Sequence, residues 1–315
     1  MSDQIGWLRE ATVNDTGGIN NVFLAAMPDC PSWNYRFPYR EQYPEDHQKY
    51  NKDLIRRFLS PEYEDWVVIV IDDKDPASDS NKVVAFAIWD IAYCNRRRYG
   101  NDYKSTSPAQ DTFNAGGSSR KDADPKHMAA FRKGLAESKE RYFAAFDTER
   151  MNLQILATLP AFRHRGYATH LVRWGMNKAR DDEVFLTLNA SPQGSTLYRS
   201  LGFHVLGSQR SQVPGEEEFI EDTAMVDGTG FNSERIRSYF EEQYEEPSQS
   251  IPHALSARLY FVATPSMATK IHNAGRELLL IHECFERFIN RTILHRPDAT
   301  STDPTTCLTI LTSLW

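Results

Sequence analysis

The stretch of residues 153–180 most constrains what this chain can fold into. An apolar, strand-like run, Leu153–Leu159, ends at Pro160 and leads into the basic turn Arg163-His164-Arg165-Gly166-Tyr167-Ala168. The residues that follow, 169–180, place apolar side chains near helical spacing. The sequence therefore predicts a strand, a basic turn with one glycine, and a helix start in direct succession.

This order of elements predicts an anion site at the start of the helix. The first amides of a helix have no intrahelical acceptor, and the peptide dipoles add partial positive charge there. A pyrophosphate can accept several of those N–H bonds at once. Gly166 has no Cβ, so phosphate oxygens can approach the backbone closely, and Ala168 keeps the next exposed position small. Arg163 and Arg165 add positive charge.

The turn resembles the acyl-CoA pyrophosphate loop of the GNAT N-acetyltransferase superfamily, whose pattern is Q/R-x-x-G-x-G/A. Arg163, Gly166 and Ala168 stand at its three defined positions. A second stretch, Leu197–Phe203, reads LYRSLGF and is similar to the family's closing "LYxxLGF" block. The resemblance covers residues 5–227 in outline, is sharpest over 153–203, and is closest in style to filamentous-fungal members.

The resemblance implies an α/β (α+β) fold with a GNAT-like, mixed and mostly antiparallel central sheet flanked by helices. The GNAT-like domain would occupy residues 1–230 with a variable insert at 95–146, and residues 231–315 would form a partly helical, partly disordered extension. Apolar and polar patterning places strands at 6–11, 66–71, 83–92, 152–159, 183–189, 203–206 and 219–226. It places helices at 45–59, 126–146, 169–180 and 195–201, and one more that follows the capping residues 12–15 and extends to Ala26. Residues 28–38 and 95–125 are expected to be irregular, the latter a mobile loop or lid.

By resemblance, the strand before the turn would run along the pantetheine arm of the cofactor and offer backbone N–H groups to it and to the thioester oxygen. Ser191 lies near the place of a family asparagine that holds the pantetheine, and loop capping is its alternative role. The expected cofactor-binding residues are Ala157, Thr158, Leu159, Arg163, His164, Arg165, Gly166, Tyr167, Ala168, Thr169 and Ser191.

Tyr198 is the candidate catalytic acid, because a phenol can donate a proton to a departing thiolate and the family's tyrosine at this place does so. Its alternative role is to pack beneath the acyl group or to hydrogen-bond the sulfur. Asp90 lies in the apolar run VVAFAIWDIA, where an unpaired carboxylate is costly. It is a candidate for amine binding or proton relay, and a structural hydrogen bond to a loop is the alternative. The general base stays open.

The composition of the chain limits the classes of partner that it is expected to bind. A formal net charge of −7 speaks against nucleic acid as the main partner, and no run is long and apolar enough to span a membrane. The N-terminus has no signal-peptide pattern, and the cysteines show no C-x-x-C spacing, so reduced thiols and a cytoplasmic location are expected. No metal-ligand spacing occurs, so no metal is expected. The run Arg96–Arg98 is read as a solvated face, with the cofactor's 3′-phosphate as its alternative partner.

These features predict an acyltransferase that moves an acetyl group from acetyl-CoA to a primary amine of a small molecule by direct transfer. Aromatic residues at 33–39 indicate a flat or apolar acceptor. The alternatives are an O-acyltransferase or a non-acyl tailoring reaction on a biosynthetic intermediate, a protein N-acetyltransferase, and an acyl-CoA sensor without turnover. The tail is read as a docking or oligomerising appendage, with a homodimer among the assemblies it would allow.

Overall fold

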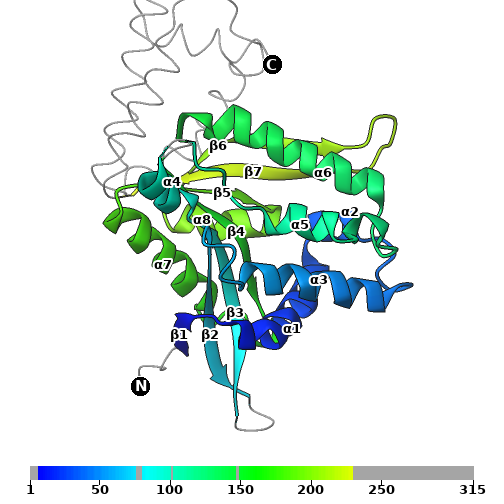
Figure 1. Cartoon of the computed structure of the whole chain (residues 1–315), viewed down its shortest axis with the longest axis horizontal. Coiled ribbons are helices and arrows are strands. Elements are labelled where there is room, and N and C mark those ends of the chain that lie inside the picture. The colour runs from blue at the N-terminus through cyan, green and yellow to red at the C-terminus, as the bar shows by residue number, and fades with distance from the viewer. Residues whose placement is uncertain (1–5, 76–79, 101, 147–148, 230–315) are drawn as a thin grey trace, which may run out of the picture. The chain divides into compact units, whose positions relative to one another are not determined.

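The computed structural model describes residues 6–75, 80–100, 102–146 and 149–229 of the chain. These residues build a seven-stranded sheet in the order β1-β2-β3-β4-β5-β7-β6. In Figure 1, β2 and β3 run almost vertically whereas β6 and β7 run almost horizontally, which shows how strongly the sheet twists. The strands are β1 Trp7–Glu10, β2 Trp66–Lys74, β3 Asn81–Asp90, β4 Arg150–Thr158, β5 Phe185–Ala190, β6 Phe203–Gln212 and β7 Phe219–Asp227.

The neighbouring strands pair antiparallel except β4 and β5, which are parallel. The mixed, mostly antiparallel sheet flanked by helices is therefore confirmed, and within it β2 and β3 pair antiparallel. A parallel pair needs a crossover connection, and α7 (Tyr167–Asp181) is that connection between β4 and β5. The helix consequently starts at the carboxyl end of β4, where the basic turn lies.

Helices cover both faces of the sheet. One face carries α7 and α8 (Pro192–Ser200), and its core includes Leu171 and Tyr198 from these helices. The opposite face carries the remaining larger helices over two further apolar clusters. They are α1 Thr16–Ala26, α2 Pro31–Arg36, α3 Pro44–Phe58, α5 Pro108–Asn114 and α6 Pro125–Ser138, while α4 Ala92–Tyr99 directly follows β3.

Close packing fixes the position of α7 on the sheet. Its face with Leu171, Val172 and Met176 is buried against β3 and β4. Gly175 lies in the middle of that face, and a Cβ there would come within 2.2 Å of the Trp89 ring on β3. A side chain at this position would push the helix away from the sheet, so this contact helps to hold the helix start in place.

Two segments expected to be irregular contain helices. Residues 28–38 include α2, and the expected lid 95–125 includes the end of α4, all of α5 and a 3-10 turn. The buried carboxylate of Asp65 explains the order of the second segment, because it accepts hydrogen bonds from the Asn95 side chain (2.8 Å) and the Thr106 amide (2.6 Å). The proposed helices of the extension lie outside the described residues, and the boundary at 230 stays a prediction.

Candidate functional site

The central strand β4 has an irregular register at Gln154. Ile88 of β3 pairs with Ile155 and the next residue, Trp89, pairs with Leu153, which leaves Gln154 as an extra residue on β4. Such a β-bulge shifts the alternation of side chains by one position. Leu153 accordingly packs in the core under α7, whereas Ile155 packs in the core under α1 and α3.

The pairing between β4 and β5 ends at this bulge. Their ladder ends with the pair Leu153 and Leu188, although β4 continues to Thr158 and β5 to Ala190. Gln154 is exposed, which is unusual for a central strand of a seven-stranded sheet. The sheet therefore opens between two adjacent strands at their carboxyl ends.

Alternation along β4 identifies the backbone groups that face this opening. The Leu159 amide donates to the Val84 carbonyl of β3 (2.8 Å), so the amides of Leu159 and Ala157 point toward β3. The amides of Leu156 and Thr158 consequently point the other way, toward β5. Of the expected donors, Thr158 therefore faces β5, whereas Ala157 and Leu159 face β3. Leu156, which was not among the expected donors, faces β5 as well. Strict alternation backward from the turn could have found Leu156.

The turn after β4 places Gly166 at the N-cap of α7 with φ +84° and ψ 0°. This left-handed backbone conformation favours glycine, and a Cβ there would meet no atom closer than His170 Cδ2 at 4.0 Å. Among the described residues no side chain caps the helix, and the first bond to the turn runs from the His170 amide to the Gly166 carbonyl. The amides of Tyr167, Ala168 and Thr169 are thus left for an external acceptor.

The side chains of the turn are only partly directed to that acceptor. The Arg163 guanidinium pairs with Asp29 (2.5 Å), and Arg165 donates to the Ala161 carbonyl (3.2 Å). His164 adopts a positive φ of 62°. The Tyr167 ring is buried in the core and its hydroxyl donates to Asp73, so Tyr167 offers its backbone and not its side chain to the site.

Ser191 caps the next helix. Its Oγ accepts from the Gly194 amide of α8 (3.2 Å), which is the loop-capping alternative. Asn189, two residues earlier, accepts from the Ser138 hydroxyl of α6 (2.7 Å). Both side chains are therefore engaged within the protein.

Tyr198 lies one turn after Gly194 and is 7% exposed. Its ring packs against Phe203, with 5.6 Å between the ring centroids. Within the described part of the chain its hydroxyl has no hydrogen bond, and burial raises the pKa of the phenol. A raised pKa keeps the phenol protonated at neutral pH, which is the state that a proton donor needs.

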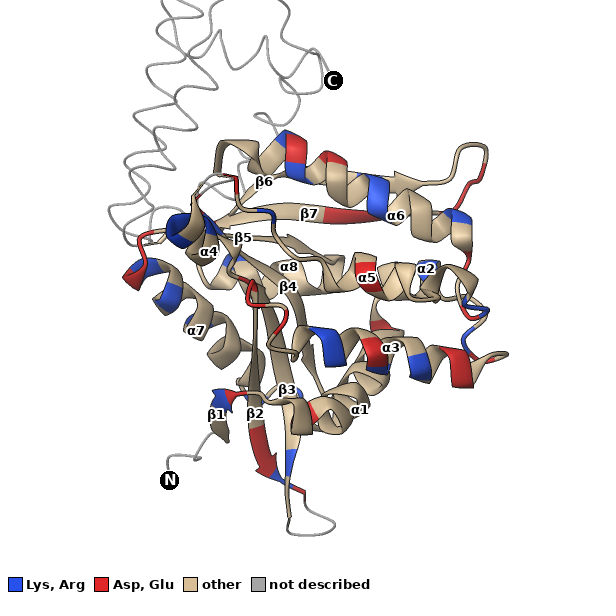
Figure 2. Cartoon of the chain, viewed as in Figure 1, with Lys and Arg blue, Asp and Glu red and all other residues tan. Residues whose placement is uncertain are grey.

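Asp90 and the arginine run lie away from the turn. Asp90 stands opposite Asn152 at the start of β4, accepts from the Ala92 amide (2.9 Å), and has a pKa raised by burial. Arg97 of α4 donates to the carbonyl of Asp182, the C-cap of α7. The basic end of α4 in Figure 2 is therefore separated from the turn by the length of α7, about 22 Å. The 3′-phosphate alternative for the arginine run does not fit this distance.

A link that the sequence did not reveal joins the starts of α7 and α8. Asp29 pairs through its carboxylate with Arg163, and its backbone carbonyl accepts from the Gln193 side chain of α8 (3.1 Å). No local pattern signals this contact, because its three residues are far apart in the chain. The segment after α1 consequently spans the open end of β4 and β5.

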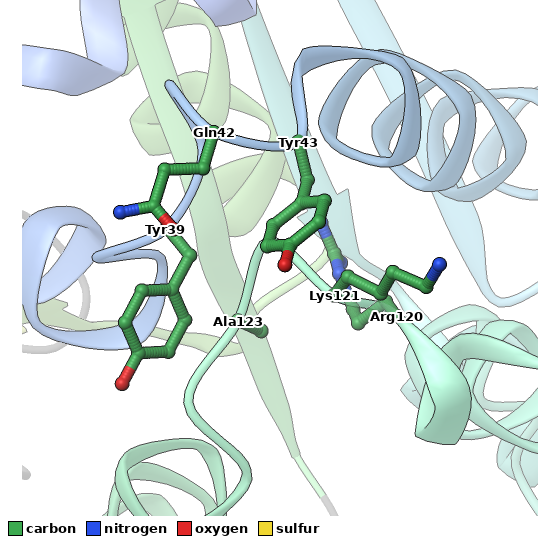
Figure 3. A pocket seen from close by; sticks show the side chains of 6 residues that line it. All are labelled: Tyr39, Gln42, Tyr43, Arg120, Lys121 and Ala123. Carbon is green, nitrogen blue, oxygen red and sulfur yellow. The ribbon is translucent and has the colours of Figure 1, made fainter.

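A pocket of about 340 Å³ lies elsewhere, between the α2–α3 loop and the segment before α6. Figure 3 shows its lining, which consists of Tyr39, Gln42, Tyr43, Arg120, Lys121 and Ala123. None of the predicted site residues lines it. Trp33, Tyr35 and Phe37, which were read as an acceptor surface, are buried core residues, while Tyr39 is 39% exposed. The aromatic cluster therefore mainly stabilises the packing of α2.

Comparison with known proteins agrees with this geometry. Residues 134–225 match the family model "Acetyltransferase (GNAT) domain". A protein named "Acetyltransferase" from Stachybotrys chartarum is 26% identical over 210 residues, which are 66% of this chain and 84% of that protein. No helix of the described residues is long and apolar enough to cross a membrane.

Two solved structures match much of this chain at low identity. The polyamine N-acetyltransferase of Drosophila melanogaster, an enzyme that forms N-acetylagmatine, is 12% identical with a TM-score of 0.45, and the similarity covers 70% of this chain and 98% of that one. The PaiA N-acetyltransferase of Thermoplasma acidophilum in complex with coenzyme A is 11% identical with a TM-score of 0.38, covering 70% and 97%.

The bulged strand, the uncapped helix start and the family match over residues 134–225 lead to one assignment. Residues 134–225 of the chain match the GNAT acetyltransferase domain.

Proposed function

We propose that the protein is an acetyl-CoA-dependent N-acetyltransferase that acts on a primary amine of a small molecule. The observation that carries this proposal is the start of α7, where three amides have no side-chain cap directly after a strand that has left its neighbour. A pyrophosphate fits such a start because it can accept several N–H bonds together. The space beside Gly166, into which a Cβ would project, supports the same fit.

The residues of β4 would hold the acyl end of the cofactor. The amides of Leu156 and Thr158 face the opening between β4 and β5, where an extended pantetheine can lie as a substitute for the missing strand pairing. An amide directed at the thioester oxygen stabilises the negative charge that develops there during attack. Loss of one such donor costs roughly 10²–10³ in kcat in other acyl-transfer enzymes.

In the proposed reaction the amine nitrogen attacks the thioester carbonyl carbon, so that a C–N bond forms and the C–S bond breaks. The thiolate that leaves takes a proton from the Tyr198 hydroxyl. Burial favours the protonated phenol before transfer, and the hydroxyl has no competing acceptor in the described part of the chain. Transfer is direct and needs no covalent enzyme intermediate.

The test is thiol release from acetyl-CoA in the presence of tyramine, tryptamine, putrescine and spermidine, each also assayed as an acylated product by mass spectrometry. We expect amide formation with at least one amine and one thiol released per amide formed. CoA binding without thiol release would favour the sensor alternative. Product esters from hydroxyl-bearing acceptors, without amides, would favour O-acylation.

A further inference from the structure

Asp222 of β7 is a mostly buried carboxylate near the open end of β4 and β5. Asp222 belongs to the same strand face as Ala224 and Val226, which pack against Phe143 beneath α6. Its side chain therefore lies on the face opposite α7 and α8. Within the described residues Asp222 forms no hydrogen bond or ion pair, although it is mostly buried.

The strand registers put Asp222 level with the opening of the sheet. Leu188 of β5 pairs with Leu153 on one side and with Met225 on the other. Asp222 and Leu156 each lie three residues beyond that row, so both stand about 10 Å past the last pair of β4 and β5. β7 is two strand spacings from β4, again about 10 Å, and an amine located over β5 would lie between them.

Polar side chains mark this path across the sheet. Gln154 is the bulged residue of β4, and its side chain is exposed at the point where β4 leaves β5. Asn189 of β5 lies on the same face as Asp222, since its side chain meets Ser138 of α6. Asn189 and Asp222 thus place two polar side chains on this face, on the neighbouring strands β5 and β7.

We propose that Asp222 is the general base that accepts a proton from the acceptor amine, and this inference rests on the N-acetyltransferase function proposed above. The ammonium gives one proton to the Asp222 carboxylate, and the neutral nitrogen attacks the thioester carbon. The nitrogen sheds its second proton as the amide forms, which balances the proton that Tyr198 gives to the thiolate. Acid and base thus act from opposite faces of the sheet.

The electrostatic surroundings of Asp222 suit this role. Burial raises the pKa of its carboxyl to about 6, and the charge of Arg36 on α2 lowers it in part. Arg36 stacks 4.0 Å from the Phe131 ring of α6 and donates to the Ser32 carbonyl, so it does not neutralise Asp222 by contact. His127 of α6 is paired with Glu216, and Arg210 of β6 lies over Phe219. A base of this pKa is ionised at neutral pH and still accepts a proton.

The experiment compares Asp222→Asn with Asp227→Asn in the full chain. Asp227 is a matched control, because it is a buried carboxyl on the same strand with a pKa raised by burial, but it accepts from the Thr229 amide and hydroxyl. For the most active amine of the panel, the wild-type kcat/KM should fall tenfold per pH unit below about pH 6. Asp222→Asn should lower kcat at least ~100-fold and abolish the fall of kcat/KM at acidic pH, with the CoA affinity unchanged. Asp227→Asn should keep the fall of kcat/KM at acidic pH.

A stability measurement separates a functional carboxyl from a structural one. A carboxyl with a folded pKa raised above its unfolded value contributes stability below that unfolded value, and the contribution is lost as pH rises through the folded pKa. The contribution of Asp222 should therefore be lost between about pH 4 and pH 6, and Asp222→Asn should melt higher than wild type at pH 7.5 and equally at pH 4. A lower melting temperature at pH 7.5 would overturn the proposal.

The outcomes distinguish this inference from the proposed function. A wild-type protein that acetylates an amine while Asp222→Asn keeps its rate and the fall of kcat/KM at acidic pH overturns the role of Asp222 alone. A wild-type protein that binds CoA but acetylates no amine overturns the proposed function and the role of Asp222 with it. If Asp222→Asn fails to fold, the same measurements on Asp222→Ser decide the question.

Discussion

The starts of α7 and α8 stand side by side at the carboxyl ends of two parallel strands, and their first turns are completed in opposite ways. α8 is closed by its own sequence, because Ser191 accepts from the Gly194 amide. α7 begins at a left-handed Gly166 with no side-chain cap. The comparison shows why the uncapped amides of α7 point to a ligand: the neighbouring helix α8, in the same environment, has its first amides capped by a side chain. Here α7 would contribute backbone to binding, and α8 would contribute the Tyr198 side chain to chemistry.

The largest effect is expected on the α8 side. Tyr198→Phe removes the proton donor, so kcat should fall by about 10²–10³ while CoA affinity changes less than about threefold. Stopped assays of thiol release, together with calorimetric titration of CoA, measure the two quantities. A variant with wild-type kcat would remove the acid role and leave α8 a packing element.

The next largest effect is expected on CoA binding at the start of α7. Gly166→Glu puts a carboxylate into the space where phosphate oxygens would lie and strains a residue with φ +84°, so the Kd for CoA should rise about 100-fold, or ~2.7 kcal/mol. Gly215→Glu is the control, since Gly215 has φ +87° in an open turn away from the site. Equal CoA affinity in both variants would contradict the pyrophosphate assignment.

A smaller effect is expected when the cap of α8 is removed. Ser191→Ala should lower the free energy of unfolding by about 1 kcal/mol, as other N-cap losses do, and leave CoA affinity within a factor of about three. Chemical denaturation and CoA titration test both parts. A large loss of CoA affinity would mean that Ser191 contacts the cofactor, and the contrast between the two helices would fail.

The smallest effect concerns the link between the helices. Asp29→Asn weakens an ion pair whose aspartate side chain is 64% exposed, so stability should change by less than about 0.5 kcal/mol. The freed Arg163 should then raise CoA affinity about two- to fivefold, because a partly neutralised guanidinium becomes available to phosphate. A fall in CoA affinity would indicate that Asp29 positions Arg163 for binding.

Local patterns sufficed to predict α7 and its basic turn, because the glycine, the charges and the apolar spacing all lie within a few residues. They did not suffice for the donors on β4, since the bulge at Gln154 exists only relative to β3. The helices within 95–125 were missed for a similar reason, because the buried Asp65 that orders them is distant in sequence. Asp222 was not predicted, as only the covering by α2 and α6 gives a strand carboxylate an unusual environment.

The extra residue at Gln154 has a consequence for how the site could be gained or lost. Deleting it would restore unbroken alternation along β4 and exchange the faces of Ile155 and Ala157, which now pack in a different core from Leu153. Such a chain would have to repack two cores to recover an ordinary sheet. A descendant of this protein can therefore lose its chemistry through single side chains, but it cannot easily close the gap between β4 and β5. We therefore expect relatives that have lost the activity to keep the opening between β4 and β5.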